Sequence, residues 1–446
     1  MPLLQAVLTL LSIYSTSAAP LLGTTGFIPV KAESSSAAGE IFFWFIPPRD
    51  GNANAPLVLW LQGGPGGSGI QDGLLFIHGP LQIINGKLAQ REVSWNNHFA
   101  MLYVDQPVGT GYSFTTNASD PKTYASSEAD VAEMMHSFLL QFYDEKKLWP
   151  RSNPLFVTGE SYGGHYCPAI GSMIMQKGNI KNLHGVAIGD GLTDPETQVL
   201  TKPLNAYNFG LIDEKLLGDA TAHAKQASLL SIAGDYKGAL AEREAMEQIV
   251  QDASGVNLYD VRTFSGYDMT AEEAWLNSPS TKAMLGIPSG VDFGTADLVE
   301  DALASDIMRS VRHDVPGLLK LPRGLLIYTG QFDWKDGVVS NEAWLQKLAW
   351  AGKRNFSAAP RRLLNRKESD GTSVPYGWGK TYDGGADEGR LSWVTISGAG
   401  HMAPHDQPEA ALAMITEWIG GESWWLTSSA GVPKDSKISH KAEVLV

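Results

Sequence analysis

The sequence predicts an α/β fold in which helices cover a mostly parallel sheet. Short apolar runs recur along the chain, each ends in a turn, and helical patterns lie between them. Such runs are typical of strands buried on both faces, and their alternation with helices is the α/β pattern. The strand-like runs are Ile41–Pro47, Leu57–Leu61, Met101–Val104, Leu155–Thr158, Val186–Ile188, Leu325–Tyr328 and Trp393–Ile396, and the helical patterns are Glu128–Tyr143, Tyr166–Gln176, Glu342–Trp350 and Glu409–Ile419.

The central part of the chain breaks this alternation. From about residue 196 to residue 323 the pattern is helical and polar, as in Ala239–Ala253, and we expect a helical insertion or cap between two strands of the sheet. The expected organisation is a signal peptide (1–19), the first part of the core (20–195), the insertion (196–323), the second part of the core (324–427) and a loose tail (428–446).

Composition narrows the class of protein. The chain has 446 residues, of which 43% are hydrophobic and 18% charged, so it can build a large core and is not disordered as a whole. With 34 Lys and Arg against 48 Asp and Glu, its formal charge of −14 argues against nucleic acid or anionic membrane surfaces as partners. The single cysteine, Cys167, excludes an intramolecular disulfide and a Cys-based zinc site.

The N-terminus predicts entry into the secretory pathway. An apolar run from Leu3 to Tyr14 is followed by small residues through Ala19, which is the pattern of a signal peptide. The run is too short to span a membrane, which needs ~18 residues or more, and no other stretch is long enough. Asn117 and Asn355 begin Asn-x-Ser sequons and are candidate glycosylation sites, so we expect a secreted or a vacuolar or lysosomal protein.

A candidate nucleophile lies at the end of the fourth predicted strand. Gly159-Glu160-Ser161-Tyr162-Gly163 follows Leu155–Thr158 and opens a helical pattern, which is the setting of a G-x-S-x-G nucleophile elbow. The glycines allow a sharp turn where the backbone crowds its neighbours. We therefore predict that Ser161 is the nucleophile.

The partners of Ser161 follow in the order that this type of site uses, which is Ser, then an acid, then His. Asp333 lies just past the strand Leu325–Tyr328, and His401 lies just past Trp393–Ile396. An oxyanion hole needs two backbone N–H groups aimed at one point. The N–H of Tyr162 is one candidate, and that of Gly64 in the loop after Leu57–Leu61 is the other.

The chain also contains four longer motifs: WLQGGPGGSG (60–69), VDQPVGTGYS (104–113), GESYGGHY (159–166) and GHMAPHDQP (400–408). Together they resemble the signature segments of the serine carboxypeptidases, and the resemblance spans about Phe42 to Ile419. Gln62, Gly67 and the Gly-Gln-Phe-Asp form around Asp333 are similar to the retinoid-inducible and vitellogenic-like branch, whereas the scarcity of cysteine differs from the disulfide-rich yeast and plant members.

The resemblance implies an α/β-hydrolase fold and release of the last residue of a peptide, with peptide or protein C-termini as partners and with no metal and no cofactor. It also implies that Gln62, Gly63 and Glu160 bind the substrate's terminal carboxylate. The sequence departs from the family at Ile77, where a glutamate usually supports this network. The strength and pH dependence of carboxylate binding are therefore open.

Two other functions remain compatible with the sequence: an acyltransferase or esterase on the same scaffold, and a catalytically idle protein that binds peptides. We expect peptide hydrolysis to be best at acidic pH, because Glu160 can donate a hydrogen bond to the substrate carboxylate only while it is protonated. No motif in the sequence indicates the side-chain preference, the natural substrate or the oligomeric state.

Overall fold

The computed structural model describes residues 22–294 and 297–421, so the predicted signal peptide and the tail at 428–446 lie outside the described residues. One mixed sheet has the order β1-β2-β6-β3-β8-β9-β10-β13-β12-β11, with β7 paired to β2, and β4 and β5 form a separate hairpin. The strands are β1 (Thr24–Lys31), β2 (Ala38–Ile46), β3 (Leu57–Leu61), β4 (Leu81–Ile84), β5 (Lys87–Gln90), β6 (Ala100–Val104), β7 (Phe114–Thr115), β8 (Leu155–Glu160), β9 (Leu183–Gly189), β10 (Gly324–Gly330), β11 (Arg362–Lys367), β12 (Ser373–Asp383) and β13 (Arg390–Ile396).

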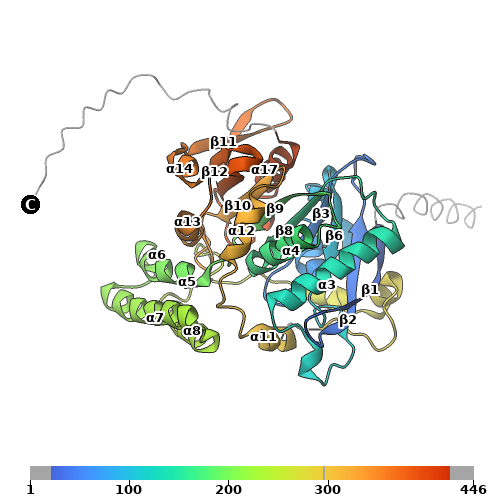
Figure 1. Cartoon of the computed structure of the whole chain (residues 1–446), viewed down its shortest axis with the longest axis horizontal. Helices are drawn as coiled ribbons and strands as arrows, with labels where there is room; N and C mark the ends of the chain where they lie inside the picture. Colours follow the sequence, from blue (N-terminus) through green and yellow to red (C-terminus); the bar gives the residue numbers. More distant parts are fainter. Residues whose placement is uncertain (1–21, 295–296, 422–446) are drawn as a thin grey trace, which may run out of the picture.

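Helices cover both faces of the sheet (Figure 1). In β3, Leu57, Leu59 and Leu61 point into a core shared with α3 (Glu128–Gln141) and α4 (Gly163–Lys177). The alternate residues Val58 and Trp60 point into the core on the other face, which includes the buried side of α17 (Pro408–Gly420). Every residue of β3 is buried, as a strand with helices on both faces requires.

The predicted parallel centre is present, and the edges of the sheet are antiparallel. Strands β6, β3, β8, β9, β10 and β13 run parallel, whereas β1, β2, β11 and β12 are antiparallel to their neighbours. The predicted strand Ile41–Pro47 corresponds to β2 and is one of these antiparallel strands. Because β2 pairs antiparallel with β6, its last residue Ile46 lies beside Met101, near the start of β6, opposite the carboxyl ends of the parallel strands.

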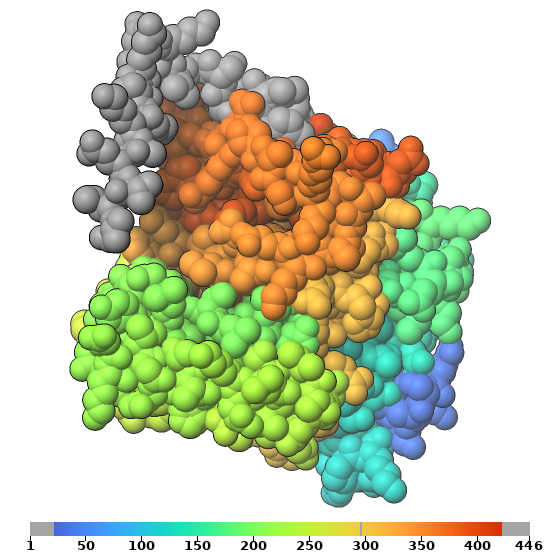
Figure 2. All heavy atoms as spheres, turned by 60° about the vertical axis from the view of Figure 1, so that its left-hand side comes forward, coloured from blue at the N-terminus to red at the C-terminus, as the bar shows by residue number. Residues whose placement is uncertain are grey.

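Between β9 and β10, the described residues form helices and turns and add no strand to the sheet. The longest of these helices, α7 and α8, pack against each other. They project from the body of the molecule in Figure 1, and Figure 2 shows this green segment against the orange segment that follows β10. The helices are α5 (Pro195–Gln198), α6 (Lys202–Asn208), α7 (Glu214–Ala233), α8 (Tyr236–Ser254), α9 (Thr270–Leu276), α10 (Pro279–Leu285), α11 (Asp297–Leu303) and α12 (Val315–Leu318).

The second part of the core adds α13 (Val338–Lys347), α14 (Lys353–Ala358), α15 (Gly385–Glu388) and α16 (Ala403–Asp406). Near the N-terminal part, a π-helix (Gly69–Ile77) follows the loop after β3. No helix within residues 22–294 and 297–421 is long and apolar enough to cross a membrane.

Candidate active site

Ser161 stands on a sharp turn between β8 and α4, and its φ of 61° lies in the left-handed region that non-glycine residues rarely adopt. The glycines on either side have a steric reason. A Cβ on Gly159 would lie 2.6 Å from the carbonyl oxygen of Leu61, and one on Gly163 would lie 3.0 Å from the same atom. The turn therefore has the geometry of a nucleophile elbow, with the serine lifted off the end of the strand.

Asp333 and His401 meet although 68 residues separate them. His401 Nδ1 lies 2.9 Å from Asp333 Oδ2, and the two residues are 2% and 1% exposed. Asp333 also accepts hydrogen bonds from the N–H groups of Lys335 (2.7 Å) and Asp336 (3.2 Å), which fix its carboxylate. Burial lowers the pKa of His401, but the charge of Asp333 and the hydrogen bond to it raise that pKa more, so the net direction is upward.

Close contact between two loops brings this pair together. A Cβ on Gly330, at the end of β10, would lie 1.8 Å from the carbonyl oxygen of Gly400, so only glycine allows the loops to touch. The insertion adds a further anchor, because His401 N–H donates to the carbonyl oxygen of Tyr259 (2.7 Å) and the two rings pack edge to face. Tyr259 carries no sequence signature and was not predicted.

Two cavities meet at Ser161. The Gln62 cavity, of about 330 Å³, is lined by Gln62, Ser161 and His401 among others, with apolar walls from Tyr267, Met269 and Met402. The Arg243 cavity, of about 130 Å³, reaches from Ser161 toward α8 of the insertion. His401 Nε2 has no hydrogen-bond partner among the described residues, so it is available to a group that enters the Gln62 cavity.

The two candidate oxyanion donors lie beside Ser161. Gly64, with φ of 108°, and Tyr162 both line the Arg243 cavity together with Ser161. Within the part of the chain that the structure describes, neither of their N–H groups donates to a protein acceptor. A Cβ on the preceding Gly63 would lie 2.4 Å from Tyr162 N, so the glycine loop packs directly on the elbow.

Gln62 and Glu160 are both buried near the same cavity. Trp60 Nε1 donates to Gln62 Oε1 (3.0 Å), which leaves the Gln62 Nε2 group as a donor. Glu160 is 0% exposed, and its carboxyl group faces the side chain of Gln62, although no described residue gives it a hydrogen bond of ordinary geometry. Burial raises the pKa of Glu160 to about 8, so this group carries a proton at neutral pH.

A third carboxyl group, Asp72, lines the Gln62 cavity and was missed by the sequence analysis. It lies in the π-helix, and a Cβ on Gly67 would lie 3.2 Å from its Oδ2. Burial, followed by the charges of Asp105 and Glu272, raises the pKa of Asp72 to about 8. Ile77, at the position where the family usually has a glutamate, is 1% exposed and packs in the apolar core.

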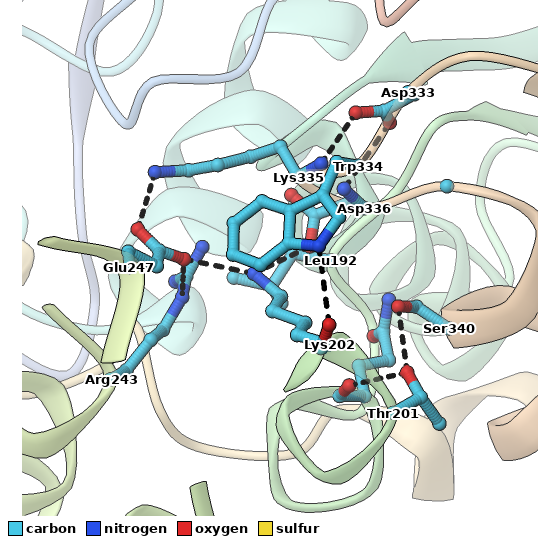
Figure 3. Close-up of polar contacts among 12 residues, drawn as sticks. Leu192, Thr201, Lys202, Arg243, Glu247, Asp333, Trp334, Lys335, Asp336 and Ser340 are labelled. Carbon is cyan, nitrogen blue, oxygen red and sulfur yellow. Dashed lines mark hydrogen bonds and ion pairs between the residues drawn. The ribbon is translucent and has the colours of Figure 1, made fainter. Parts of the chain in front are cut away.

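A buried ionic cluster connects the insertion to the loop of Asp333 (Figure 3). Glu247 of α8 accepts from Lys202 Nζ (2.9 Å) and Arg243 Nε (2.9 Å) through one oxygen, and from Lys335 Nζ (2.6 Å) through the other. Burial opposes ionisation, but the charges of Arg243, Lys202 and Lys335 lower the pKa of Glu247 well below its ordinary value. Lys335 thus reaches both the insertion, through its side chain, and Asp333, through its backbone N–H.

The remaining candidates lie away from these cavities. Asn117 and Asn355 are both exposed. The Asn355 amide nitrogen donates to Tyr382 Oη (2.8 Å) and Glu388 Oε2 (3.0 Å), whereas Asn117 uses its oxygen to accept from Ser119 N (3.2 Å). The amide nitrogen is the atom that would carry a glycan, so Asn117 is the more accessible candidate.

Comparison with known proteins identifies close counterparts. A family model described as serine carboxypeptidase matches residues 17–421. "Serine carboxypeptidase-like 50" of Arabidopsis thaliana is 33% identical over 406 residues, which cover 89% of this chain and 87% of that protein. "Probable serine carboxypeptidase CPVL" of Dictyostelium discoideum is 35% identical over 419 residues, which cover 89% of this chain and 78% of that protein.

The fold has a counterpart among solved structures. Kex1(delta)p, a prohormone-processing carboxypeptidase from Saccharomyces cerevisiae, superimposes with a TM-score of 0.77 at 24% identity, covering 92% of this chain and 96% of that one. This likeness confirms the predicted α/β-hydrolase fold.

Proposed function

The chain belongs to the serine carboxypeptidase family and is a serine-type carboxypeptidase, and from this premise we propose that Ser161, His401 and Asp333 are its catalytic triad. The observation that carries the proposal is the buried pair of His401 and Asp333, 2.9 Å apart, on a cavity that Ser161 also lines. The left-handed backbone of Ser161 is the second support, since strain of this kind is concentrated at functional residues.

In the proposed mechanism Ser161 Oγ attacks the carbonyl carbon of the last peptide bond. His401 Nε2 takes the hydroxyl proton and then gives it to the departing amine. Asp333 holds His401 in the tautomer with its proton on Nδ1, which leaves Nε2 free to act as the base. Water, activated by the same imidazole, then releases the shortened peptide from Ser161.

The N–H groups of Gly64 and Tyr162 would stabilise the oxyanion that forms during attack. Both residues line a cavity with Ser161, and neither N–H group donates to a described protein acceptor. Such donors typically contribute about 10²–10³ in rate each, because they are aimed in advance at the charge that develops.

The substrate's terminal carboxylate would bind at the opposite end of the Gln62 cavity. Gln62 Nε2 and Gly63 N–H are its donors, and Glu160 donates while protonated. We add Asp72 to this set, because it lines the same cavity and its pKa, like that of Glu160, is raised to about 8. With both groups protonated, the site presents donors and no charge that repels the substrate.

Glu160 and Asp72 determine the direction in which the rate of peptide hydrolysis changes with pH. Above about pH 8, Glu160 and Asp72 lose their protons and repel the substrate carboxylate, so peptide hydrolysis falls. At low pH the reaction is limited by His401, which must be neutral to act as a base. For substrates with a free carboxylate, the best hydrolysis is therefore expected below about pH 8, and the raised pKa of His401 keeps it from extending far into acidic solution.

The walls of the Gln62 cavity favour a bulky apolar residue at the substrate's C-terminus. Tyr267, Met269 and Met402 supply aromatic and thioether surface, and the volume of about 330 Å³ accommodates a large side chain. Release of Phe, Leu or Met faster than Asp or Gly from peptides of otherwise equal sequence is the expected result. Equal rates would show that these walls do not contact the released residue.

One comparison of substrates separates this function from its alternatives. A blocked dipeptide with a free C-terminus should be hydrolysed faster than its amide, and Ser161→Ala should abolish turnover without unfolding the protein. An esterase or acyltransferase would prefer the ester, or would transfer the acyl group to an added alcohol. Binding without turnover would indicate the idle homologue.

We further propose that the protein follows the secretory route to the outside of the cell or to a vacuole or lysosome. The apolar N-terminal run and the exposed sequon at Asn117 support this. Loss of a glycan from the secreted protein on Asn117→Gln, measured as increased mobility on a gel, is the test.

A further inference from the structure

Asp190 is a buried acid that the proposed mechanism does not use. It follows β9 with φ of 43°, a conformation that aspartate tolerates better than most residues. Its N–H donates to the carbonyl oxygen of Tyr328 (2.8 Å), and its Oδ1 accepts from Gly330 N (2.8 Å) at the end of β10. On its other side, Ser161 N–H donates to the oxygen of the preceding Gly189 (3.0 Å), so Asp190 lies between the strand ends that carry Ser161 and Asp333.

The carboxyl group of Asp190 lies close to Asp333 and His401. One oxygen of Asp190, one oxygen of Asp333 and one ring nitrogen of His401 lie within 4.8 Å of one another. Asp190 is 0% exposed, and its Oδ2 has no donor among the described residues. When two carboxyl groups lie this close in a buried site, the pKa of one of them is strongly raised, so that group holds a proton.

The hydrogen bonds indicate which of the two carboxyl groups, Asp190 or Asp333, holds the proton. Asp333 accepts from His401, Lys335 and Asp336, and three donors stabilise its ionised form. Among the described residues, Asp190 accepts a hydrogen bond from Gly330 N–H only. Burial, followed by the charge of Asp333, raises the pKa of Asp190 well above its ordinary value.

Three other titratable groups lie near Asp190: Glu160, Tyr328 and His401. Glu160, when ionised, raises the pKa of Asp190 further. Tyr328 is buried, with its own pKa well above the ordinary value, so it adds no charge. The cationic form of His401 is directed to Asp333 through Nδ1.

We propose that Asp190 is a positioning residue: a neutral carboxylic acid that donates a hydrogen bond from Oδ2 to Asp333 and ties the strand ends of the triad together. This inference rests on the proposed roles of Asp333 and His401. The neutral acid adds a donor to Asp333 without adding a second negative charge. A second charge would hold His401 in its protonated form, which cannot act as a base.

Asp190→Asn tests this, because asparagine can accept from Gly330 and donate to Asp333 as the protonated acid does. The measurement is kcat/KM against pH for an ester substrate, whose acid limb reports the pKa of His401. If Asp190 is neutral, the acid limb stays in place and kcat stays within a few-fold. If Asp190 is ionised, removing a charge within 4.8 Å lowers that limb by about 2.5 pH units at an effective dielectric of about 20, which would overturn the proposal.

A control and a second variant complete the test. Asp194 lies in the same loop and is also 0% exposed, but it pairs with Arg312, so Asp194→Asn should leave the acid limb unchanged. Asp190→Ala leaves Gly330 N–H without its acceptor and Asp333 without its donor, and should lower kcat at least about 10-fold below Asp190→Asn. Equal loss in both variants, with both folded, would contradict the role of the hydrogen bond.

Infrared difference spectroscopy gives a readout that needs no turnover. Wild type minus Asp190→Asn should contain the C=O stretch of a protonated carboxyl group at pH 7, and a carboxylate band in its place would overturn the proposal. If the infrared result contradicts the neutral form of Asp190, the proposed roles of Ser161, His401 and Asp333 still stand. Turnover by Ser161→Ala would instead refute the proposed triad. The two failures are therefore distinguishable.

Discussion

The fall of kcat/KM for peptide hydrolysis at alkaline pH should reflect the loss of two protons, one from Glu160 and one from Asp72. Asp72 lines the Gln62 cavity, Glu160 is buried beside Gln62, and the pKa of each carboxyl group is raised to about 8. Glu160→Gln and Asp72→Asn each keep a donor of similar shape and remove one titration. The double variant Glu160→Gln/Asp72→Asn removes both.

The magnitude follows from the number of protons required. One unit above the pKa of a required acid, about a tenth of that acid remains protonated. At pH 9, wild type should therefore have lost about 100-fold in kcat/KM for a free-acid peptide, and each single variant about 10-fold. The double variant should stay nearly flat over this range. The two carboxyl groups also raise each other's pKa, so their titrations belong to the pair and the wild-type limb is spread over a wider pH range.

The assay is kcat/KM from pH 5 to pH 10 for a blocked dipeptide and for the ester that lacks the free carboxylate. The ester should show little of the alkaline loss in any variant, because no substrate charge faces the two carboxyl groups. A wild-type limb that matches Glu160→Gln in slope and position would show that Glu160 does not titrate in this range. A wild-type slope equal to that of Asp72→Asn would remove Asp72 from the carboxylate site.

Three further substitutions test the site and its support. Asp333→Asn should keep the fold and lower kcat by about 10⁴, since the amide favours the wrong tautomer of His401; activity near wild type would mean that another acid orients the imidazole. Gly63→Ala should lower kcat by at least about 10², because its Cβ would lie 2.4 Å from Tyr162 N; unchanged kcat would show that the loop yields without cost. Glu247→Gln should lower the free energy of unfolding by about 3–5 kcal/mol in urea titrations, since the buried Lys202 and Arg243 and the partly exposed Lys335 lose a counter-charge, and a change under about 1 kcal/mol would show that water compensates them.

The parts of the site that sequence predicts are those defined by local chain geometry. Ser161 needs a strand, a sharp turn and a helix within a few residues, and glycines mark that turn in the sequence. Asp333 and His401 follow strand ends at the same edge of a parallel sheet, so finding the strands places both residues. Periodicity and turn residues are sufficient for this kind of prediction.

The parts that sequence missed depend on contacts between distant segments. Strand β12 is long and only partly buried, with polar residues and two glycines, so it lacks the apolar run that marks the central strands. Tyr259 and Glu247 come from the insertion, where helical periodicity gives no hint that α8 reaches the loop of Asp333. Glu247 contacts Lys335 from α8, whereas Tyr259 lies in the segment after α8 and accepts from His401 N–H. No spacing in the sequence records either contact.

Asp72 is an acid close in sequence to the position where the family usually has its glutamate. This chain has Ile77 at that position, which left the strength and pH dependence of carboxylate binding open. In the structure the segment from Gly69 to Ile77 is a π-helix, whose turns take more residues than those of an α-helix, and His78 N–H donates to the oxygen of Gly73, five residues back. The wider turns bring a different residue, Asp72, to the cavity while Ile77 packs in the core. The proposed carboxylate site therefore takes its second acid from Asp72 in the π-helix, and not from the position at a fixed distance from the proline.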